Sequence, residues 1–570
     1  MTGPALQALN AGDTKSAARL LRQHISHEPV DPNAWLPLAA CHLSDLPDRA
    51  LLLVERTLAI APASASARQN AIALLRPTRN LKRLLHHLDR SIAVQDTSDL
   101  RLLRAEMLAA DGRLQEAQRD YRTVLEREPG HFAANVNLAG ILNNDGRSRE
   151  AEILVRRALA LAPDAAPGWH NLTYAWLQRG KTAATLLAAR VAATLDPLSP
   201  VSQVNLAATT ETAGLPGVDL ALRRAVALTP DFPAAMLSLA RYASRMSDWL
   251  RLEEWARRTL SVAPGSADAA LTLAQGFLVR GDARHGWPYW EARLSRPGLI
   301  RTELSGRRWN GEVIPGSRLL LHCEQGFGET IQFVRLVPIA ARRTGSVLLE
   351  TVRELAPLLS RSFPEIEVFV RGTRSPPHDY QCSLPSLPAA LDASLTEAPG
   401  PVPYLTPDPS AVAAWRQKLK DLPRPWIGFC WRGNPQFVDD RRRSPGLAAL
   451  RETANSAASL ISLTKIPTDE DRASMGAIKD LSTELATFDD TAALIAALDL
   501  VITSDTAIAH LSGGLGQKTW VMLAHAADWR WLMERDDAPW YPTATLFRQA
   551  RPGDWSTVDH ALAERLRDLA

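Results

Sequence analysis

The segment LVITSDTAIAHLSGGLGQKTWVML, residues 500–523, decides which class of fold the C-terminal half adopts. It opens with the apolar, β-branched run Leu500–Thr503, which is typical of a buried parallel strand. Ser504-Asp505-Thr506 then offers a helix N-cap, and Ala507–Leu515 has the small residues of a short helix. Thr519–Leu523 has the pattern of a second strand. The segment therefore predicts a strand–helix–strand unit of an α/β sheet.

The start of this helix follows the carboxyl end of a strand, where α/β sheets hold anionic ligands. Its first N–H groups have no partner within the helix, and the helix dipole favours negative charge there. We predict that Asp505, Thr506 and Ala507 hold the phosphate or diphosphate of an activated sugar. The alternative is an ordinary αβ unit with a capped helix and no ligand.

The composition is that of a globular protein. The chain has 570 residues, of which 46% are hydrophobic and 22% charged, so we expect at least two domains with large cores. A formal net charge of +3 is too small to argue for binding to nucleic acid or a membrane surface. The four cysteines (Cys41, Cys323, Cys382, Cys430) are widely separated and predict neither a zinc site nor a disulfide framework.

The N-terminal stretch MTGPALQALNAGDTKSAARLL lacks the basic and apolar regions of a signal peptide. The sequence also lacks any run of about 18 apolar residues, the length that a membrane-spanning helix needs. Together with the cysteine pattern, these features predict a soluble, cytoplasmic protein.

Phrases that end in proline recur along the N-terminal half at intervals of 33 or 34 residues. They end at Pro29, Pro62, Pro129, Pro163, Pro197, Pro230 and Pro264, and Asp96 stands where a further proline is due. Glycines recur every 34 residues at Gly112, Gly146, Gly180 and Gly214. Each unit has two apolar-periodic stretches with a glycine turn between them, which predicts an array of helical hairpins.

This period resembles that of the tetratricopeptide repeats over roughly residues 5–298. We expect seven or eight units that stack into a superhelix with a concave groove, because one unit cannot bury its apolar face alone. The resemblance implies that the groove binds protein. The last unit, around Gly281–Arg296, is degenerate and contains Trp287 and Trp290. We expect it to cap the array against the next domain.

Asn137, Asn171 and Asn205 are 34 residues apart, on the first helices of successive units. In this family the inner face of the first helices lines the groove. An asparagine amide both donates and accepts hydrogen bonds, so a row of them would hold the backbone of a protein acceptor without reading its side chains. The alternative, to which we give equal weight, is that each asparagine caps or bridges adjacent helices.

A linker-like stretch rich in glycine and proline at residues 299–317 precedes a new alternation of strands and helices. Strands are predicted at Arg318–Cys323, Ser346–Glu350, Glu367–Val370, Trp426–Trp431, Ser459–Leu463, Lys479–Leu481, Leu500–Thr503 and Thr519–Leu523, and helices at Thr330–Arg343, Arg353–Ser362, Thr491–Leu498 and Thr557–Leu569. Residues 373–424 are rich in proline and are predicted to form loops and short helices. This alternation predicts two Rossmann-like lobes with a cleft between them.

The predicted fold is therefore an α-helical superhelix followed by an α/β region. The superhelix spans residues 1–298, and the linker spans 299–317. One lobe spans residues 318–423 on the acceptor side, and the other spans 424–570 on the donor side.

Gly326, Gly328 and Glu329 come directly after the first predicted strand. The glycines allow a tight turn that brings backbone close to a ligand. A carboxylate at the start of the next helix is suited to act as a general base toward an acceptor hydroxyl. The alternative is that Glu329 only complements the helix dipole.

Arg432 and Asn434 follow the strand Trp426–Trp431, and the run Asp439–Ser444 adds three more arginines. Arginine clamps phosphate with two parallel hydrogen bonds, so these residues are donor-binding candidates. In a run of three, we expect at least one to be solvated.

Lys465 follows the strand Ser459–Leu463 and is placed to neutralise a leaving diphosphate. His510 lies one turn into the helix after Thr506 and is a second catalytic candidate, although a buried histidine with satisfied hydrogen bonds is an equally fair interpretation. The tryptophans between Asp528 and Trp555 would stack on a base or sugar, or pack the lobes together. We favour packing for most of them.

Four motifs occur in the order GFGETIQFVRLVP (326–338), WRGNP with DDRRRS (431–444), SLTK (462–465) and DTAIAHLSGGLGQKTWVML (505–523). Together they resemble the bacterial tetratricopeptide-repeat glycosyltransferases, whose catalytic domain is similar to the heptosyltransferase family and has the GT-B fold. The architecture also resembles that of the O-linked N-acetylglucosamine transferases. The resemblance covers nearly the whole chain.

The resemblance implies sugar transfer from a nucleotide-sugar donor by an inverting mechanism, with no bound metal or other cofactor. In the heptosyltransferases a Gly-Asp pair carries the aspartate that is taken as the base. Gly328-Glu329 stands in its place here, and glutamate is one methylene longer. The resemblance also implies donor-phosphate binding by the backbone of Thr506 and Ala507.

The expected function is therefore transfer of a sugar to a serine or threonine of a protein acceptor held by the repeats. Among bacterial acceptors, flagellin is the first that the resemblance suggests. One alternative is a transferase that acts on lipopolysaccharide or another glycan, and another is a catalytically silent protein-binding scaffold. The transferase hypothesis requires Glu329 and the Asp505-Thr506 corner to face each other across a gap wide enough for a nucleotide.

Overall fold

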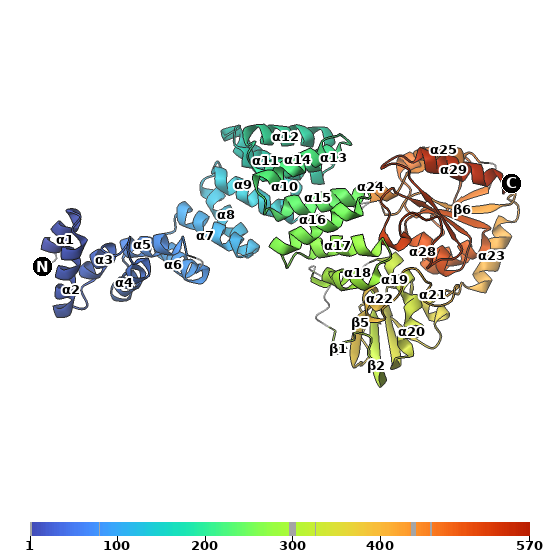
Figure 1. Cartoon of the computed structure of the whole chain (residues 1–570), viewed down its shortest axis with the longest axis horizontal. Coiled ribbons are helices and arrows are strands. Elements are labelled where there is room, and N and C mark those ends of the chain that lie inside the picture. The colour runs from blue at the N-terminus through green and yellow to red at the C-terminus, as the bar shows by residue number, and fades with distance from the viewer. Residues whose placement is uncertain are drawn as a thin grey trace. The chain divides into compact units, whose positions relative to one another are not determined.

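The computed structural model of the chain describes residues 3–78, 80–295, 304–324, 326–434, 440–456 and 459–569. The chain separates into two compact units, Met1–Thr229 and Pro230–Ala570. The regular elements of the first unit, among its described residues, are all helices. The second unit begins with helices and continues into two sheets (Figure 1).

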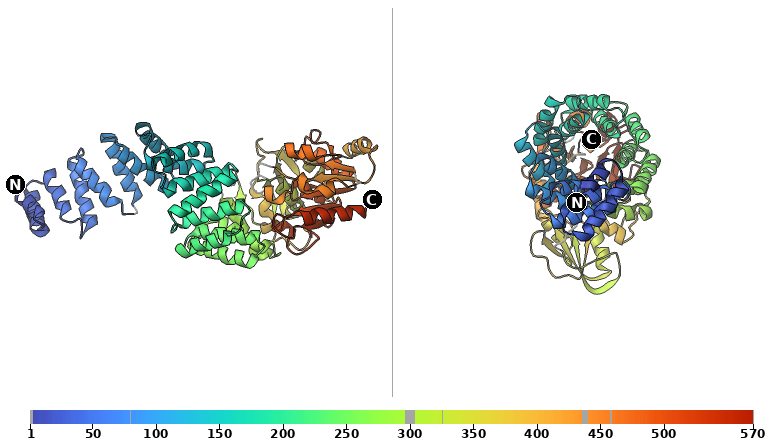
Figure 2. Two further views of the ribbon diagram at one scale, coloured as in Figure 1. Left: turned by 90° about the horizontal axis from the view of Figure 1, so that it is seen from above. Right: turned by 90° about the vertical axis from the view of Figure 1, so that its left-hand side faces the viewer.

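Helices of the first unit pair into hairpins that stack side by side along the chain (Figures 1 and 2). They are α1 (Gly3–Asn10), α2 (Thr14–His27), α3 (Pro32–Ala40), α4 (Pro47–Ile60), α5 (Ala65–Leu75), α6 (Leu81–Val94), α7 (Ser98–Ala110), α8 (Leu114–Arg127), α9 (Phe132–Asn144), α10 (Ser148–Leu161), α11 (Ala166–Gln178), α12 (Thr182–Leu195), α13 (Pro200–Thr212) and α14 (Val218–Leu228). Alanines such as Ala117 and Ala151 are fully buried where helices meet. Their small side chains allow close helix packing, so the array buries an apolar face that no hairpin could bury alone.

The recurring glycines close the turns inside the hairpins. Gly112, Gly146, Gly180 and Gly214 all have a positive φ, between 66° and 77°. Residues with a Cβ rarely adopt this conformation, which explains why glycine returns at this position of each unit.

The recurring prolines mark a second repeated device, between hairpins. The side chain six residues after the proline donates a hydrogen bond to the proline carbonyl. Trp35 bonds Pro29 at 2.9 Å, and Trp169 bonds Pro163 at 2.7 Å. Asn135 and Arg68 do the same to the prolines that precede them. These bonds fix the connection between successive hairpins.

The described residues contain nine hairpins, whereas the sequence predicted seven or eight. The last two are formed by α15 (Pro233–Arg245), α16 (Trp249–Val262), α17 (Ala267–Leu278) and α18 (Ala283–Trp290). The prediction was too low because the seven prolines and Asp96 mark eight boundaries, and eight boundaries separate nine hairpins. The stretch before the first stop folds into α1 and α2.

The second unit continues from α18 through the short helix η1 (Glu291–Ser295) into a parallel sheet. Its strands are β1 (Arg307–Arg308), β2 (Ile314–His322), β3 (Thr344–Thr351), β4 (Glu367–Val370) and β5 (Tyr380–Ser383), in the order β1-β5-β2-β3-β4. The helices of this part are α19 (Phe327–Phe333), η2 (Val334–Leu336), α20 (Val337–Ala341), α21 (Ala356–Ser362), η3 (Leu384–Ser386) and α22 (Leu387–Ala390). The strand order reverses between β2 and β5, so that point is the topological switch point of the sheet.

The described strands of the second sheet also pair in parallel. Its strands are β6 (Trp426–Cys430), β7 (Ser459–Ser462), β8 (Lys479–Asp480), β9 (Leu500–Ser504), β10 (Thr519–Leu523) and β11 (Ala544–Arg548), in the order β11-β10-β9-β6-β7-β8. The accompanying helices are α23 (Pro409–Leu419), α24 (Asp440–Arg443), η4 (Leu447–Ala449), α25 (Arg451–Ala454), α26 (Asp469–Ser474), α27 (Phe488–Ala497), α28 (Ala507–Gly514), η5 (Trp529–Trp531) and α29 (Ser556–Arg567). In chain order this is the arrangement of the doubly wound dinucleotide-binding folds, with its switch point between β6 and β9.

Helices cover both faces of the second sheet. Phe429 belongs to a core cluster with Val558 and Leu562 of α29. Val501 belongs to another with Leu494 of α27 and Leu511 of α28. Strands covered on both faces are apolar throughout, as the run Leu500–Thr503 is.

Several elements differ from the sequence predictions. The single helix predicted at Thr330–Arg343 is divided into α19, η2 and α20, because Pro338 in the first turn of α20 has no N–H to continue a helix. The predicted linker 299–317 contains β1 and the start of β2. The sequence also missed β5, in the proline-rich region, and β11, which lies among the tryptophans.

The predicted boundary at residue 298 separates helices from strands, but it does not separate the compact units. Leu252 of α16 and Trp287 of α18 share one hydrophobic core with Trp309 and Leu319 of the first sheet. In addition, the indole N–H of Trp287 donates to the carbonyl oxygen of Ala393 at 3.0 Å. The expectation that the last hairpin caps the array against the next domain is therefore confirmed.

This shared core predicts how the chain tolerates truncation. A fragment of residues 230–570 is expected to fold cooperatively, whereas residues 299–570 should aggregate or melt at a clearly lower temperature. The shorter fragment loses buried side chains such as Leu252 and Trp287, each worth about 1.5–3 kcal/mol of burial. Calorimetry of both fragments tests this. Equal melting temperatures would show that the last two hairpins are dispensable.

Candidate functional site

Helix α19, which follows β2, packs against α28, which follows β9. Gly328 lies at this contact: a Cβ there would be 2.9 Å from Cδ2 of His510 and 3.5 Å from Cα of Ala507. Only glycine allows so close an approach. The segment with Glu329 and the start of α28 are thus neighbours, although at Gly328 they touch, where the sequence predicted a gap of nucleotide width.

Glu329 forms an ion pair with Arg530, which belongs to η5 in the segment between β10 and β11. Oε1 of Glu329 accepts a hydrogen bond from Nη2 of Arg530 at 3.0 Å. The Glu329 side chain is 33% exposed, whereas that of Arg530 is 9% exposed. The carboxylate therefore faces accessible space, and its partner is buried.

Two further hydrogen bonds fix the guanidinium of Arg530. Its Nε donates to Oε1 of Gln332 at 2.6 Å, and its Nη1 donates to Oδ1 of Asp528 at 2.8 Å. The guanidinium also lies 4.4 Å from the ring centroid of Trp529. A planar group held at three nitrogen atoms has a defined orientation, and it transmits that orientation to Glu329.

The surroundings of the site raise the pKa of two carboxyl groups. Burial raises the pKa of Glu329, and the neighbouring Arg530 opposes this effect. Although one third of the side chain is exposed, the surrounding protein removes enough water to disfavour the charged form. Burial also raises the pKa of Asp505, with a further contribution from the negative charge of Asp528.

His510 is buried and its hydrogen bonding is internal. A 3.0 Å hydrogen bond joins its Nδ1 to the hydroxyl of Tyr541, and its ring stacks on Trp531 with centroids 5.6 Å apart. Burial lowers its pKa to about 3. Because this ring stays neutral near neutral pH, the geometry favours a packing role over the predicted catalytic role.

Thr506 caps α28 at the switch point of the second sheet. Its Oγ1 accepts a hydrogen bond from the Ile508 N–H at 3.3 Å, and Oγ1 of Thr503 lies 3.2 Å away. Gly433, at the end of β6, approaches the same corner, since a Cβ there would be 3.3 Å from Cγ2 of Thr506. It would also lie 2.9 Å from Nη2 of Arg443. The N-terminus of α28 and the arginine of α24 thus meet at the carboxyl ends of β6 and β9.

The other donor-binding candidates have partners of their own. Nε of Arg432 lies 3.1 Å from Oδ2 of Asp471. The ammonium group of Lys465 donates to the carbonyl oxygens of Ser482, at 3.1 Å, and Leu485. These contacts tie Arg432 to α26 and Lys465 to the segment after β8.

Asn434 is exposed at the end of a described segment. The residues that follow it, 435–439, lie outside the described residues and include Asp439. Of the remaining acidic and basic run, Asp440 is buried and accepts a hydrogen bond from Ser444 at 3.0 Å.

The asparagines of the repeats do not behave alike. The Asn171 amide donates to the Val136 carbonyl oxygen at 2.8 Å and so bridges α11 to α9. This is the bridging role that the sequence left open, and it commits the amide to the array itself. Asn137 and Asn205 are half-buried on α9 and α13. A row of asparagines that holds a protein acceptor stays a prediction for these two.

The switch point of the first sheet is occupied by an arginine from the end of the helical part. Nη2 of Arg293 donates to Glu324 at 2.8 Å, and also to the hydroxyls of Ser383 and Ser386. The side chains of Arg293 and Glu324 are only 5% and 6% exposed. An ion pair thus fills this position. The second switch point holds an ion pair too, with Nε of Arg443 3.3 Å from Oδ1 of Asp440, but it also has the capped N-terminus of α28.

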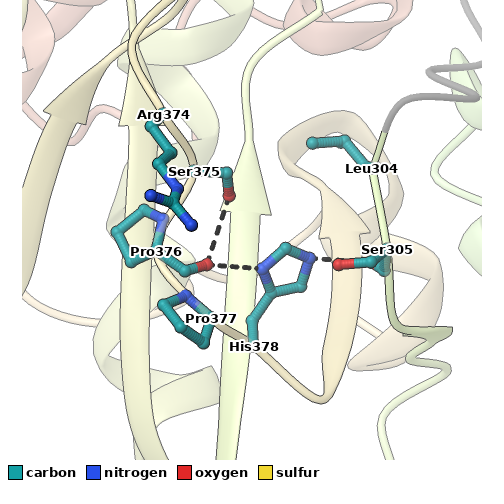
Figure 3. Close-up of a pocket in the computed structure, with 7 residues that line it drawn as sticks. All are labelled: Leu304, Ser305, Arg374, Ser375, Pro376, Pro377 and His378. Carbon is teal, nitrogen blue, oxygen red and sulfur yellow. Dashed lines mark hydrogen bonds between the residues drawn. The ribbon is translucent and has the colours of Figure 1, made fainter.

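A cavity of about 470 Å³ lies elsewhere, before β5 (Figure 3). Its described lining consists of Leu304, Ser305, Arg374, Ser375, Pro376, Pro377 and His378. The ring of His378 lies between two carbonyl oxygens, with Nδ1 2.9 Å from that of Pro376 and Nε2 2.7 Å from that of Ser305. Both nitrogens donate only when the ring is protonated. This lining includes none of the predicted site residues.

Among the described residues, His24, Glu28 and Asp31 are the group close enough to share a metal ion. Their closeness has a simpler cause: Nε2 of His24 lies 2.9 Å from Oδ2 of Asp31, which also caps α3. No described helix is both long enough and apolar enough to cross a membrane.

Sequence reasoning missed Arg530, Gln332 and Arg293 as members of these ion-pair networks. Arg530 lies between two tryptophans, in a stretch whose pattern indicates aromatic packing and not a charged site. A buried arginine needs a carboxylate partner, and no spacing in the sequence shows which of 62 acidic residues supplies it. The expectation that most of these tryptophans pack is confirmed, since Trp529, Trp531 and Trp540 are buried.

Comparison with known proteins identifies the helical part. Residues 108–177 match the tetratricopeptide repeat family. Protein FlbA of Caulobacter vibrioides is 28% identical over 465 residues, which cover 76% of this chain and 72% of that protein. The chain therefore contains tetratricopeptide repeats, an architecture that binds proteins.

Solved structures resemble parts of the chain. A chain of the APC/C hetero-tetramer Cut9-Hcn1 is 13% identical with a TM-score of 0.37, over 50% of this chain and 57% of that chain. The TPR protein YrrB is 16% identical with a TM-score of 0.29, over 32% and 96%. PilW, a type IV pilus biogenesis factor, is 21% identical with a TM-score of 0.31, over 36% and 96%.

The contact at Gly328 predicts that Gly328→Ala is destabilising. The new methyl group would meet the buried ring of His510, so the helices must separate at a cost of about 1–3 kcal/mol. Chemical unfolding followed by tryptophan fluorescence measures this loss. Gly265→Ala, where a Cβ meets open space, is the matched control. An equal effect of both changes would rule out the close contact.

The buried His510 predicts a pH dependence of stability. Its pKa is about 3 when folded against an ordinary value of 6.5, so the unfolded chain gains a proton first as the pH falls. Stability is therefore lost below pH 6.5, by about 1.4 kcal/mol for each pH unit. Between pH 7 and 5, His510→Gln should lose about 2 kcal/mol less than the parent chain. His27→Gln, at an exposed position of α2, should match the parent.

Proposed function

We propose that the second unit is a GT-B glycosyltransferase that transfers a sugar from a nucleotide-sugar donor to a protein, with inversion and without a metal or other cofactor. The repeats present the acceptor, whose serine or threonine hydroxyl is the nucleophile. Two parallel sheets with Rossmann-like strand orders support the proposed fold class.

One observation carries this proposal. Glu329 lies in α19, directly after strand β2 of the first sheet, and the backbone of its neighbour Gly328 lies against the start of α28 at the switch point of the second sheet. The reaction requires a base that takes the proton of the attacking hydroxyl, and a carboxylate with a raised pKa is suited to this. It also requires a group that stabilises the departing phosphate, and a helix N-terminus binds anions.

In the proposed reaction, Glu329 accepts the proton of the acceptor hydroxyl as its oxygen attacks the anomeric carbon. Oε1 is held by Arg530, and Oε2 lies toward Gly326, where a Cβ would be 3.2 Å from it. The bond between the anomeric carbon and the leaving phosphate breaks in the same step. The N-terminus of α28 and Arg443 stabilise the charge that develops on the phosphate.

The acceptor and the cellular location follow from the resemblance and from the repeats. Flagellin is the acceptor we propose, bound along the tetratricopeptide repeats. The cytoplasm is the location we propose, because Cys41, Cys323, Cys382 and Cys430 are all free thiols, as a reducing compartment requires. The similarity to Protein FlbA supports a common architecture and, at 28% identity, does not assign an activity.

A protein-binding scaffold without catalytic activity is the second candidate. It is favoured by the contact at Gly328, where α19 and α28 touch, and by the ion pair that already engages Glu329. A scaffold needs the repeats alone, whereas a transferase also needs a donor to enter between these elements.

Mass spectrometry of surface and secreted proteins separates these candidates. Cells with the parent chain are compared with cells that carry no copy, Glu329→Gln, or the control Glu365→Gln at an exposed position. We expect a sugar mass on a protein acceptor that needs the chain, survives Glu365→Gln and falls about 10²–10⁴-fold in Glu329→Gln.

Other outcomes decide among the alternatives. Full modification in Glu329→Gln would rule out this base. A mass change confined to lipopolysaccharide would replace the protein acceptor by a glycan. If no sugar depends on the chain and protein partners still co-purify with it, the scaffold is the correct function.

A further inference from the structure

Two buried arginines hold two carboxylates near the end of β2: that of Glu324, which follows the strand, and that of Glu329, in α19. Arg293 pairs with Glu324 at 2.8 Å, and Arg530 pairs with Glu329 at 3.0 Å. Arg293 comes from η1 at the end of the helical part, and Arg530 comes from η5 beyond the second sheet. The two carboxylates are therefore held by two other parts of the second unit.

The pair of Trp529 and Arg530 forms a junction of three structural parts. The Trp529 ring packs edge-on against Trp287 and Trp290 of α18, with centroids 5.3 and 5.6 Å apart. The guanidinium of Arg530 lies 5.8 Å from the ring centroid of Trp290. Its Nε also donates a hydrogen bond to Oε1 of Gln332 in α19 at 2.6 Å. The last repeat hairpin, the first sheet and the second sheet thus meet at two consecutive residues.

The geometry points to Arg530 as a positioning residue that sets the orientation of Glu329 and links it, through Trp529, to the last hairpin of the repeats. Nothing in the motifs that predicted the donor and catalytic residues assigns this role. Its catalytic consequence rests on the proposed function, whereas the link itself does not.

Arginine is suited to this position for a physical reason. Nε, Nη1 and Nη2 each donate to a different residue, so rotation of the guanidinium would break at least one hydrogen bond to a buried or charged partner. A lysine at this position would keep the charge, but its single ammonium group cannot reproduce the planar fork. Compared with a neutral residue, Arg530→Lys should therefore restore part of the charge effect on Glu329, but it should restore little of the orientation of the Glu329 carboxylate.

The charged groups that act on Glu329 are Arg530, Glu324, Arg293 and Asp528. Arg530 is the one that contacts the carboxylate, and it favours the ionised form. The negative charges of Glu324 and Asp528 favour the protonated form, as burial does. Removal of the guanidinium leaves the opposing effects in place, so Glu329 should be protonated at higher pH.

Carbodiimide labelling of carboxyl groups tests this on the full chain and needs no enzymatic activity. Labelling of Glu329 with an added amine is followed by peptide mass spectrometry from pH 5 to 8 and normalised to the exposed Glu365. In Arg530→Gln we expect labelling near neutral pH to rise about tenfold, since an adjacent opposite charge shifts a carboxyl by one pH unit or more. Arg530→Lys should restore part of the protection.

Two further variants define the mechanism. Arg535→Gln removes a guanidinium that pairs with Asp537 near the surface and should leave Glu329 labelling unchanged. Trp290→Leu keeps every charge but removes the ring against Trp529, and it should raise Glu329 labelling by less than Arg530→Gln does. An unchanged value in Trp290→Leu would remove the link to the repeats.

Asp559 reports unfolding, because its carboxylate is 6% exposed and accepts hydrogen bonds from the N–H groups of Glu452 and Thr453, away from this network. A rise at Glu329 alone supports the proposal. If labelling rises at Asp559 as well, Arg530→Gln is unfolded, and Arg530→Lys becomes the deciding variant. Unchanged Glu329 labelling in a folded Arg530→Gln, or an equal rise in Arg535→Gln, would overturn the proposal.

This experiment fails separately from the proposed function. If the labelling pattern appears but no variant transfers sugar, the positioning role stands and the transferase is wrong. If sugar transfer needs Glu329 but labelling of Glu329 is the same in Arg530→Gln and the parent chain, the transferase stands and the positioning role is wrong. In an active preparation, the acid limb of the pH–rate profile should move to higher pH in Arg530→Gln.

Discussion

The ion pair between Glu329 and Arg530 depends on a contact that glycine alone permits. Because Gly328 has no side chain, α19 approaches α28 until its backbone meets the ring of His510. This approach brings the carboxylate within 3.0 Å of a guanidinium that follows β10. A larger residue at position 328 would separate the elements that carry the two charges.

The second unit is organised around the same region at a larger scale. Leu252 and Trp287 of the helices share a core with both sheets, and Arg293 fills the switch point of the first sheet. The last two hairpins are therefore structural parts of the α/β unit although their sequence belongs to the repeats. This arrangement places the residues that follow the last hairpin in contact with Glu324, next to the helix that carries Glu329.

The sequence predicts local structure correctly where a residue type favours one conformation, as β-branched residues favour strands and threonine favours helix caps. The strand Thr519–Leu523 was predicted with its observed bounds, and Thr506 does cap the helix that follows β9. By contrast, the helix predicted from Thr330 was interrupted at Pro338. The apolar spacing of this stretch is that of one helix, but Pro338 has no N–H to continue it. Strand β11 was missed because its residues lie among tryptophans whose spacing carries no period.

The sequence by itself determined the hairpins, because a glycine at positive φ and a proline stop act within a few residues of where they stand. It also determined the parallel strands and the helix caps, for the same reason. Only the tertiary structure decided which charges pair, such as Arg530 with Glu329, 201 residues away. It also decided that the compact units divide at residue 229. Both outcomes depend on which surfaces exclude water from one another, and that is a property of the packed chain.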